Sequence, residues 1–486
     1  MFDQFKAKAP MTKANFETSA LALRQQLLQL QFTLEDSRHP IIIVMAGLDG
    51  SGKGVLVHRL NEWMDPRGID TNTYWEHSDE QESRPYFWRY WQKLPPRGRM
   101  GIFLGSWYTD ATHKRLDGSI DEGELEQACQ RINTFERQLS DDGAIIIKLW
   151  LHVSEQTQSR QLEEKAPRKQ QNPRVTEHPY ELEGKYTQTL AIAQELIRKT
   201  QTTQCPWHIV DAEDRYSREI NAGEIIRDTI GRRLDNPEQM SDLPALTPPR
   251  NFLAGVALDK TLQKEEYKRK LRKYQSRLQD LAWEAYRQKR SLVAVFEGWD
   301  GAGKGSAIRR VTGAIDPRLY KLVQIAAPSD EEHARQYSWR FWRQLQRDGR
   351  ATLFDRSWYG RVMVERVEKF ATDAEWMRAY GEINEFEQEL VAHGSIVAKF
   401  FIHISKEEQL LRFHAREKQA HKRHKITDED WRNREKWPAY EGAINQMIEQ
   451  TDTETAPWTL VAGNDKYYAR VKILKTLCKA MEKALY

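Results

Sequence analysis

The chain has 486 residues, of which 30% are charged and 39% hydrophobic, and its formal net charge is only +4. This length suits two or three domains, and so small a net charge gives no reason to expect a nucleic-acid partner. No apolar run approaches the roughly 18 residues of a membrane span, and the N-terminal residues lack the apolar core of a signal peptide. The three cysteines, Cys129, Cys205 and Cys478, match neither a disulfide framework nor a zinc site. We therefore expect a globular, cytoplasmic protein without a membrane partner.

The predicted elements alternate between helices and short apolar strands along the chain. Charged amphipathic helices are predicted near 14–36 and 258–289, one ahead of the first strand in each half. The predicted strands are 39–47, 100–104, 144–153, 291–298, 351–355 and 395–404. Because helical segments separate these buried strands, the pattern predicts an α/β fold with a parallel sheet covered on both faces.

A single offset of 251 residues relates the two halves of the chain. It joins Lys53 to Lys304, and it also aligns two copies each of DPR, SWY and PW. An offset held over so long a stretch indicates a tandem duplication. We expect two homologous domains, 1–235 and 253–486, joined by the proline-rich linker 236–252.

The strand at 291–298 runs directly into the glycine-rich stretch GWDGAGKG (298–305), and a helical pattern follows. Glycines such as Gly301, Gly303 and Gly305 let backbone N–H groups approach phosphate oxygens, and the helix adds its positive end. Lys304 supplies a mobile positive charge for a phosphoryl group in transfer. The stretch predicts a phosphate-binding loop; the alternative is a tight turn that binds no ligand.

One position of this loop departs from the usual pattern, in which Ser or Thr follows the lysine and its hydroxyl holds magnesium. Gly305 stands there instead, and Asp300 lies inside the loop. A carboxylate would repel phosphate unless a divalent cation lay between them, and magnesium prefers one or two carboxylates with phosphate oxygens. Asp300 is therefore predicted to hold Mg²⁺, or Mn²⁺ in its place; the alternative is a loop-capping aspartate bonded to backbone.

A second acid is predicted at the end of the neighbouring strand. Asp355 and Arg356 follow the apolar run 351–354, where a parallel sheet would direct both toward the phosphates. Asp355 is expected to bind magnesium directly or through water, or to act as a base, and Arg356 to hold a phosphate oxygen. The alternative is a structural ion pair between Asp355 and Arg356.

The strongest basic cluster of the chain follows the last predicted strand. Residues 412–425 read RFHAREKQAHKRHK and contain one acid, Glu417. We expect this segment to form a lid over an anionic substrate, although a solvated surface helix is the alternative. Its predicted phosphate-binding residues, together with Arg361, are Arg412, Arg416, Lys422, Arg423 and Lys425.

The offset also shows what the first half lacks. It keeps Asp49 and Lys53, but Asp355 and Arg356 correspond to Leu104 and Gly105, and Arg361 corresponds to Asp110. The lid counterpart, 161–174, is less basic. Because phosphate contacts dominate phosphoryl transfer, we predict that the second domain is catalytic and the first is degenerate.

Several motifs of the second half resemble the polyphosphate kinase 2 family: GWDGAGKG (298–305), SWRFW (338–342), FDRSWYGR (354–361) and DKYYAR (465–470). The duplicated chain resembles the two-domain polyphosphate:AMP phosphotransferases of that family. The resemblance implies a thymidylate-kinase-like, three-layer αβα fold with a helical lid, and magnesium-dependent transfer from inorganic polyphosphate to AMP. At 420–425 the chain lacks the Pro and Trp that the family often shows in the lid.

Other functions stay open at this point. Polyphosphate-dependent phosphorylation of ADP, an ATP-dependent nucleoside monophosphate kinase, and a non-enzymatic scaffold that binds polyphosphate or nucleotide are the alternatives. The Trp-rich composition and the habit of the resembled family also suggest self-association, most simply as a dimer.

Overall fold

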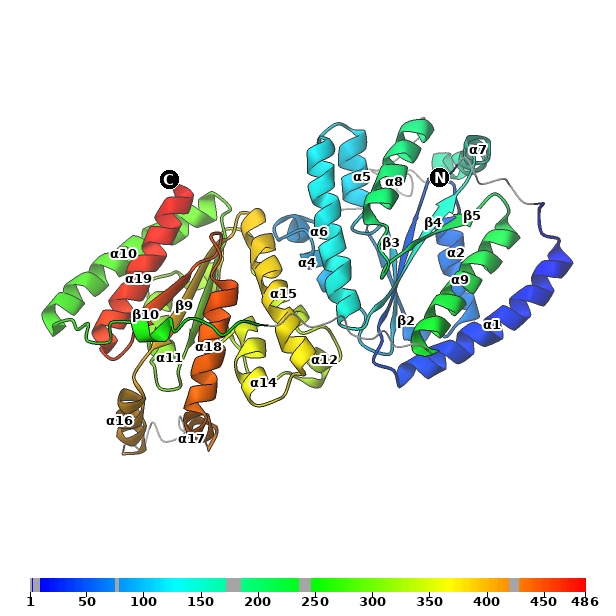
Figure 1. Cartoon of the computed structure of the whole chain (residues 1–486). Helices are drawn as coiled ribbons and strands as arrows, with labels where there is room; N and C mark the ends of the chain where they lie inside the picture. The colour runs from blue at the N-terminus through cyan, green and yellow to red at the C-terminus, as the bar shows by residue number, and fades with distance from the viewer. Residues whose placement is uncertain (1, 3–8, 75–77, 172–184, 236–245, 419–427) are drawn as a thin grey trace. The chain divides into compact units, whose positions relative to one another are not determined.

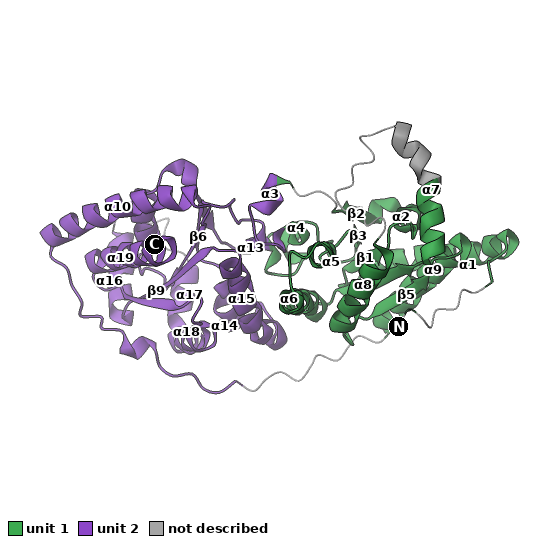
Figure 2. Cartoon of the chain, turned by 90° about the horizontal axis from the view of Figure 1, so that it is seen from above, with its two compact units in different colours: residues 1–78, 89–240, 329–339 green, residues 79–88, 241–328, 340–486 purple. Residues whose placement is uncertain are grey.

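The structure, a computed structural model, describes residue 2 and residues 9–74, 78–171, 185–235, 246–418 and 428–486, with the backbone only for 164–171. The chain forms two compact α/β units, coloured separately in Figure 2. Unit 1 comprises 1–78, 89–240 and 329–339, and unit 2 comprises 79–88, 241–328 and 340–486. Of the predicted lid, 412–425, residues 419–425 lie outside the described residues.

Unit 1 contains a five-stranded sheet and the helices around it (Figure 1). Its strands are β1 (Ile41–Gly47), β2 (Ile69–Thr73), β3 (Met100–Leu104), β4 (Ile145–His152) and β5 (Trp207–Asp211). Its longer helices are α1 (Lys13–Glu35), α2 (Lys53–Trp63), α5 (Thr109–Leu116), α6 (Glu122–Asp141), α7 (Glu155–Gln171), α8 (Tyr186–Thr200) and α9 (Arg215–Asp235).

Unit 2 repeats this arrangement. Its strands are β6 (Leu292–Gly298), β7 (Tyr320–Gln324), β8 (Ala351–Asp355), β9 (Ile396–His403) and β10 (Trp458–Ala462). Its longer helices are α10 (Lys264–Arg287), α11 (Lys304–Thr312), α15 (Asp373–Ala392), α16 (Lys406–Glu417), α17 (Asp428–Glu435), α18 (Trp437–Thr451) and α19 (Lys466–Leu485). The described part of the chain, both units together, also contains helices of four residues: α3 (Asp79–Glu82), α4 (Trp88–Trp91), α12 (Asp330–His333), α13 (Trp339–Trp342) and α14 (Val364–Val367).

Both sheets are parallel and share one strand order, β2-β3-β1-β4-β5 in unit 1 and β7-β8-β6-β9-β10 in unit 2. The register is also the same: Met45 pairs with Leu104 in unit 1, and Phe296 pairs with Asp355 in unit 2. The central strand of each sheet therefore ends beside the end of the next strand, where ligands bind in such folds.

Helices cover both faces of each sheet. In unit 2, α11 and α19 pack on one face and α15 lies on the other, with α10 against α19 and α18 against α15 (Figure 1). The central strand β6 is consequently buried along six of its seven residues. This confirms the predicted three-layer αβα architecture and its duplication. No helix among the described residues is long and apolar enough to cross a membrane.

The six predicted strands and the first predicted helix are confirmed to within two residues at their ends, whereas the helix predicted at 258–289 begins only at Lys264. Four strands were not predicted from the sequence: β2, β5, β7 and β10. All four lie at a sheet edge, and β2 and β7 each bury only one residue, with sequences IDTNT and YKLVQ that lack a continuous apolar run. Hydrophobic pattern alone does not separate such edge strands from loops.

A buried polar network supports the interior of unit 2. Lys399 on β9 donates to Glu387 Oε2 at 2.8 Å, to the Tyr359 hydroxyl at 2.9 Å and to the Thr451 carbonyl at 2.7 Å. The other oxygen of Glu387 accepts from Tyr359 and from the indole of Trp358. Unit 1 contains the same network at the same offset, made by Lys148, Glu136, Tyr108, Trp107 and Thr200.

Candidate active site

The phosphate-binding loop of unit 2 (residues 298–305) connects β6 to α11 as predicted. Gly303 caps the helix with a φ of 106°, a backbone conformation that favours glycine. At Gly298, a Cβ atom would lie 2.5 Å from the carbonyl oxygen of Ile402, so the strand can enter the loop only without a side chain there. Lys304 folds back and donates to the carbonyls of Gly298 and Trp299, which holds its ammonium group at the loop.

The structure brings Asp300 and Arg356 together. Nη2 of Arg356 lies 3.2 Å from Oδ1 of Asp300, and the backbone carbonyl of Asp300 accepts from Gln409 at 2.9 Å. Burial raises the pKa of Asp300, but the charges of Lys304 and Arg356 outweigh burial, so the pKa lies below its ordinary value. Asp300 is therefore held as a carboxylate beside two cations. Arg356 pairs with Asp300 here, rather than with Asp355 as in the structural alternative.

Arg356 adopts an unusual backbone conformation, with a φ of 64°. A residue other than glycine costs about 1–2 kcal/mol in this region, and such strain gathers at functional sites. The preceding residue, Asp355, ends β8 and is partly exposed, and its carboxylate has no hydrogen-bond partner among the described residues. The strand end thus presents one strained arginine and one unengaged acid.

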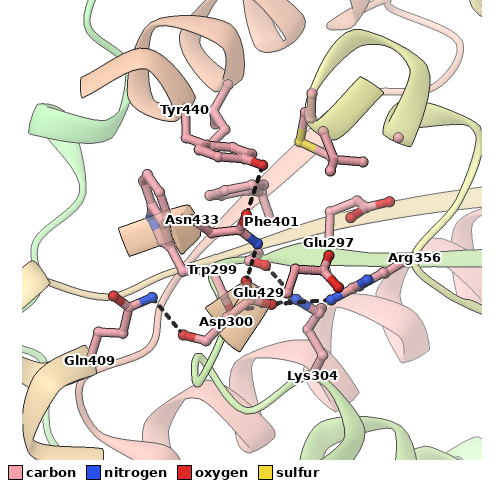
Figure 3. A pocket seen from close by; sticks show the side chains of 15 residues that line it. Glu297, Trp299, Asp300, Lys304, Arg356, Phe401, Gln409, Glu429, Asn433 and Tyr440 are labelled. Atoms are coloured by element: carbon pink, nitrogen blue, oxygen red, sulfur yellow. Dashed lines mark hydrogen bonds and ion pairs between the residues drawn. The ribbon is translucent and has the colours of Figure 1, made fainter. Parts of the chain in front are cut away.

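A pocket lies over this loop (Figure 3). Its polar side is formed by Asp300, Lys304, Arg356, Asn433 and Glu429, and by Glu297, which the sequence analysis did not single out. Glu297 is buried and accepts a hydrogen bond from the Ser357 hydroxyl at 2.8 Å. Burial raises its pKa, against the lowering effect of Lys304. The signal that could have revealed it is an acid within an otherwise apolar strand, where unit 1 has Ala46.

The opposite side of the pocket is apolar and includes Trp299, Phe401, Met363, Tyr440 and Ile444. The ring of Trp299 stacks on that of Trp437 at a centroid distance of 3.7 Å, and its indole N–H donates to Nδ1 of His403 at 2.9 Å. The pocket therefore offers an aromatic wall next to a phosphate-binding loop, a combination suited to a ligand with a flat ring and an anionic group.

The predicted phosphate-binding arginines lie in different settings. Arg412, on α16, is buried and donates to the carbonyls of Gly301, Ala302, Gly463 and Asn464 and to Glu408. These contacts favour a role in bracing the loop. Arg361 pairs with Glu365 and Glu375, and Arg416 is partly exposed on α16. The remaining three predicted cations, Lys422, Arg423 and Lys425, lie outside the described residues.

Two further cations near the loop were missed by the sequence analysis. Arg470 on α19 donates to the hydroxyl of Ser306, in the first turn of α11, at 2.9 Å. Burial, and then the neighbouring Arg412, lower the pKa of Lys466. The motif DKYYAR contains both residues, but nothing in its spacing shows that α19 brings them to the loop.

Unit 1 preserves the loop but changes its surroundings. Lys53 donates to the carbonyls of Gly47 and Leu48, and Gln158 donates to the Asp49 carbonyl, as their counterparts do in unit 2. Gly105, at the position of Arg356, has a φ of 70°. The backbone turn is therefore kept while its functional side chain is absent.

An arginine also occupies space beside the loop of unit 1. The guanidinium of Arg218, on α9, is buried, and a Cβ atom on Gly52 would lie 2.2 Å from its Nη1. Around the equivalent Gly303, no described heavy atom lies within 4 Å of such a Cβ position. Arg218 donates to the Ser51 carbonyl at 3.2 Å. The equivalent carbonyl of unit 2, that of Ala302, accepts from Arg412. The two loops are thus braced from different helices.

The acids of unit 2 fit a magnesium ion that is shared with a substrate. Among the described residues, no group of three or more His, Cys, Asp or Glu could hold a metal ion. Magnesium is commonly bound by one or two carboxylates with phosphate oxygens, so a complete protein cage is not required. Of the two predicted carboxylates, Asp300 lines the pocket, whereas Asp355 ends β8 and is not among the lining residues. Phosphate would supply the remaining ligands.

A glycine-rich loop between a strand and a helix, with a lysine folded back on it at the carboxyl edge of a parallel sheet, defines a P-loop protein that binds phosphate groups. Comparison with known families narrows this class. The family model "Polyphosphate kinase 2 (PPK2)" matches residues 11–237 and 261–485, so nearly all of both halves is covered. The chain belongs to the polyphosphate kinase 2 family.

Relatives of similar length support this assignment. The chain is 43% identical to a polyphosphate:AMP phosphotransferase of Pseudomonas aeruginosa, covering 100% of this chain and 99% of that protein. It is 34% identical to a protein of the same name from Acinetobacter johnsonii, covering 95% and 96% of the two chains. A crystal structure of a polyphosphate kinase 2 from Pseudomonas aeruginosa superposes with a TM-score of 0.88 at 43% identity, over 100% of this chain and 99% of that one.

Proposed function

We propose that this protein transfers the terminal phosphoryl group of inorganic polyphosphate to AMP, giving ADP and a polyphosphate shortened by one phosphate. The observation that carries the proposal is the assembly of Lys304, Asp300 and Arg356 around one pocket of a polyphosphate kinase 2 fold. Relatives that cover the full chain at 34–43% identity and bear the name polyphosphate:AMP phosphotransferase support the choice of donor and acceptor.

In this reaction an oxygen of the AMP phosphate attacks the terminal phosphorus, and the bond from that phosphorus to the bridging oxygen of the chain breaks. Lys304 and the N-terminus of α11 stabilise the negative charge on the phosphoryl oxygens. Arg356 turns from Asp300 toward a phosphate oxygen, where its planar guanidinium binds best.

Asp300 and Asp355 are proposed to hold Mg²⁺, or Mn²⁺, which neutralises phosphate charge when it is bound. Asp300 is the stronger candidate because it lines the pocket and its backbone carbonyl is held by Gln409. Asp355 is placed by the end of β8, beside Arg356. Arg416 and the cations of 422–425 remain proposed contacts for the polyphosphate chain, to which Lys466 and Arg470 are now added.

Unit 1 is proposed to be non-catalytic. It lacks counterparts of Asp355, Arg356 and Glu297, and the guanidinium of Arg218 lies beside Gly52, where unit 2 is open. Each of these changes alone would weaken phosphate transfer, and together they remove the charges that surround the loop in unit 2. Domain boundaries at 235 and 253 and self-association as a dimer also remain proposals. Light scattering of the purified full chain would test the dimer.

The proposed function is tested by incubating the purified chain with polyphosphate, AMP and Mg²⁺ in the absence of ATP. We expect ADP to form in step with the consumption of AMP, and chelation of Mg²⁺ to stop it. Formation of ADP only when ATP replaces polyphosphate would indicate an ordinary nucleoside monophosphate kinase. Binding of polyphosphate without any ADP would indicate a scaffold.

ADP as the acceptor is a second candidate because a shorter relative favours it. The chain is 39% identical over 256 residues to an ADP-polyphosphate phosphotransferase of Rhizobium meliloti, covering 53% of this chain and 78% of that protein. The same assay with ADP in place of AMP separates the two. We expect kcat/KM for AMP to exceed that for ADP, and the reverse order would favour ATP synthesis.

A further inference from the structure

Asn433 makes a direct contact with the carboxylate that is proposed to hold the metal. It lies on α17, and its Nδ2 donates to Oδ2 of Asp300 at 3.0 Å (Figure 3). The other oxygen, Oδ1, accepts from Arg356 at 3.2 Å. The two oxygens of Asp300 are therefore divided between one neutral amide and one guanidinium.

The amide of Asn433 is itself fixed in orientation. Its Oδ1 lies 3.1 Å from the hydroxyl of Tyr440, which can donate to it. The Tyr440 hydroxyl is also 3.2 Å from Glu368, whose side chain is 6% exposed and which accepts from Lys436 at 2.6 Å. Because the ionised carboxylate of Asp300 can only accept, the N–H of the amide faces Asp300 and its oxygen faces Tyr440. Asn433 on α17 and Tyr440 on α18, with Glu368 at the end of α14, thus hold one oxygen of the carboxylate.

This division matters because Arg356 and Asp300 could otherwise bind each other more tightly. A guanidinium and a carboxylate prefer a two-bond arrangement, in which both oxygens face both N–H groups. The present contact is a single bond of 3.2 Å, and the oxygen that a second bond would need is held by Asn433. A tight pair would withdraw Arg356 from phosphate and Asp300 from the metal.

We propose that Asn433 is a positioning residue that holds Oδ2 of Asp300 and thereby keeps Arg356 free to leave Asp300 and bind the phosphate of the substrate. This inference rests on the proposed function and adds a residue to its site. The sequence supports it, because both residues are absent from the first half. Asn433 corresponds to Leu182, and Arg356 corresponds to Gly105. Without the arginine, the first half has no pair to keep apart.

A binding cycle tests the inference without relying on turnover. The metal-free affinity for polyphosphate is measured by calorimetry, in the presence of a chelator, for the wild type, Asn433→Leu, Asp300→Asn and the double variant. With Asp300 present, Asn433→Leu should weaken binding about 10-fold, because Arg356 closes on Asp300. With Asp300→Asn, the same change should have no effect, since the charge that draws Arg356 away is gone.

Two other variants exclude a general effect on folding. Asn433→Asp keeps the size of the side chain but removes the donor, and it should weaken binding at least as much as Asn433→Leu. Glu435→Gln changes an exposed residue of the same helix and should match the wild type. In steady-state assays Asn433→Leu should lower kcat and raise the Mg²⁺ concentration needed for half-maximal rate, while KM for AMP changes less than about threefold.

Equal weakening by Asn433→Leu with and without Asp300 would overturn the inference, because the residue would then act through general structure. So would wild-type affinity in both Asn433 variants. These outcomes differ from failure of the proposed function, in which the wild type itself would neither bind polyphosphate nor form ADP.

Discussion

The two halves of this chain keep the same interior but not the same site. The buried lysine–glutamate network occurs in both units with nearly equal distances, 2.8 Å from Lys399 to Glu387 and 2.8 Å from Lys148 to Glu136. Around the phosphate-binding loops, by contrast, the aligned sequences differ: Arg356 corresponds to Gly105, and Glu297 corresponds to Ala46. The difference separates residues that hold the fold from residues that act on phosphate. Substitutions in the first set should affect the two units alike, and substitutions in the second should not.

The largest expected effect is on the shared interior. Glu387→Gln and Glu136→Gln each leave a buried lysine without its carboxylate, which typically costs about 3–5 kcal/mol. We expect each variant to lower the melting temperature by a similar amount in calorimetry of the full chain. A large loss from one change and none from the other would show that the two networks are not equivalent.

The next effect concerns the strained arginine. Arg356→Gly places the residue of unit 1 in unit 2, and it should lower kcat about 10²–10³-fold through the loss of a phosphate contact. The melting temperature should change by less than about 2 °C, because relief of the positive φ offsets the added freedom of glycine. Retained activity would show that Arg356 is not part of the active site. A large loss of stability would show that its role is structural.

The reverse change tests whether unit 1 can regain the site. In Gly105→Arg combined with Leu104→Asp, the new Cβ at 105 would lie 2.6 Å from the carbonyl oxygen of Tyr74. We expect a loss of about 1–3 kcal/mol in stability. In a Lys304→Ala background no ADP should form, because Arg218 still lies beside Gly52. Recovered transfer would show that two residues suffice and that the surroundings matter less than proposed.

The smallest expected effect is the pH dependence of stability that His403 of unit 2 contributes. Burial lowers the pKa of His403 to about 4, and its Nδ1 accepts from Trp299, which is Leu48 in the first half. The histidine is neutral when folded but gains a proton when unfolded below about pH 6.5. Its contribution to stability is therefore present above pH 6.5 and is lost as the pH falls toward 4, by about 1 kcal/mol at pH 5.5.

This dependence is measured by comparing the melting temperature of the wild type and His403→Gln from pH 7 to pH 5. The glutamine keeps an acceptor for the indole of Trp299 but does not titrate. The wild type should lose stability more steeply as the pH falls. Parallel curves for the two proteins would mean that His403 does not contribute to the acid sensitivity.

Most of the fold was predicted from the sequence because the duplication shows each apolar strand pattern twice, at the same offset. Strands β6 and β8 are buried on both faces, so their apolar runs are continuous, and the common offset identified their partners in unit 1. The edge strands β2 and β7 were missed because most of their side chains are exposed or only partly buried. An exposed strand carries no hydrophobic pattern that distinguishes it from a loop.

The site was predicted in part, for a different reason. Asp300, Lys304 and Arg356 lie within or beside the sheet ends, where topology alone determines their position. Asn433 comes from a helix more than a hundred residues further along the chain, and no pattern shows that it reaches Asp300. Arg412 was predicted from charge density, but its contacts with loop carbonyls depend on the rotation of α16. Charge composition does not determine which cation faces the substrate.

The central claim is that one of two similar loops is catalytic, and a matched pair of lysine substitutions tests it most directly. Lys304→Ala and Lys53→Ala remove side chains with the same contacts to loop carbonyls. Initial rates of ADP formation from polyphosphate and AMP should fall at least about 10³-fold in Lys304→Ala and less than about threefold in Lys53→Ala. Equal losses in the two variants, at equal folded fractions, would contradict the assignment of catalysis to unit 2.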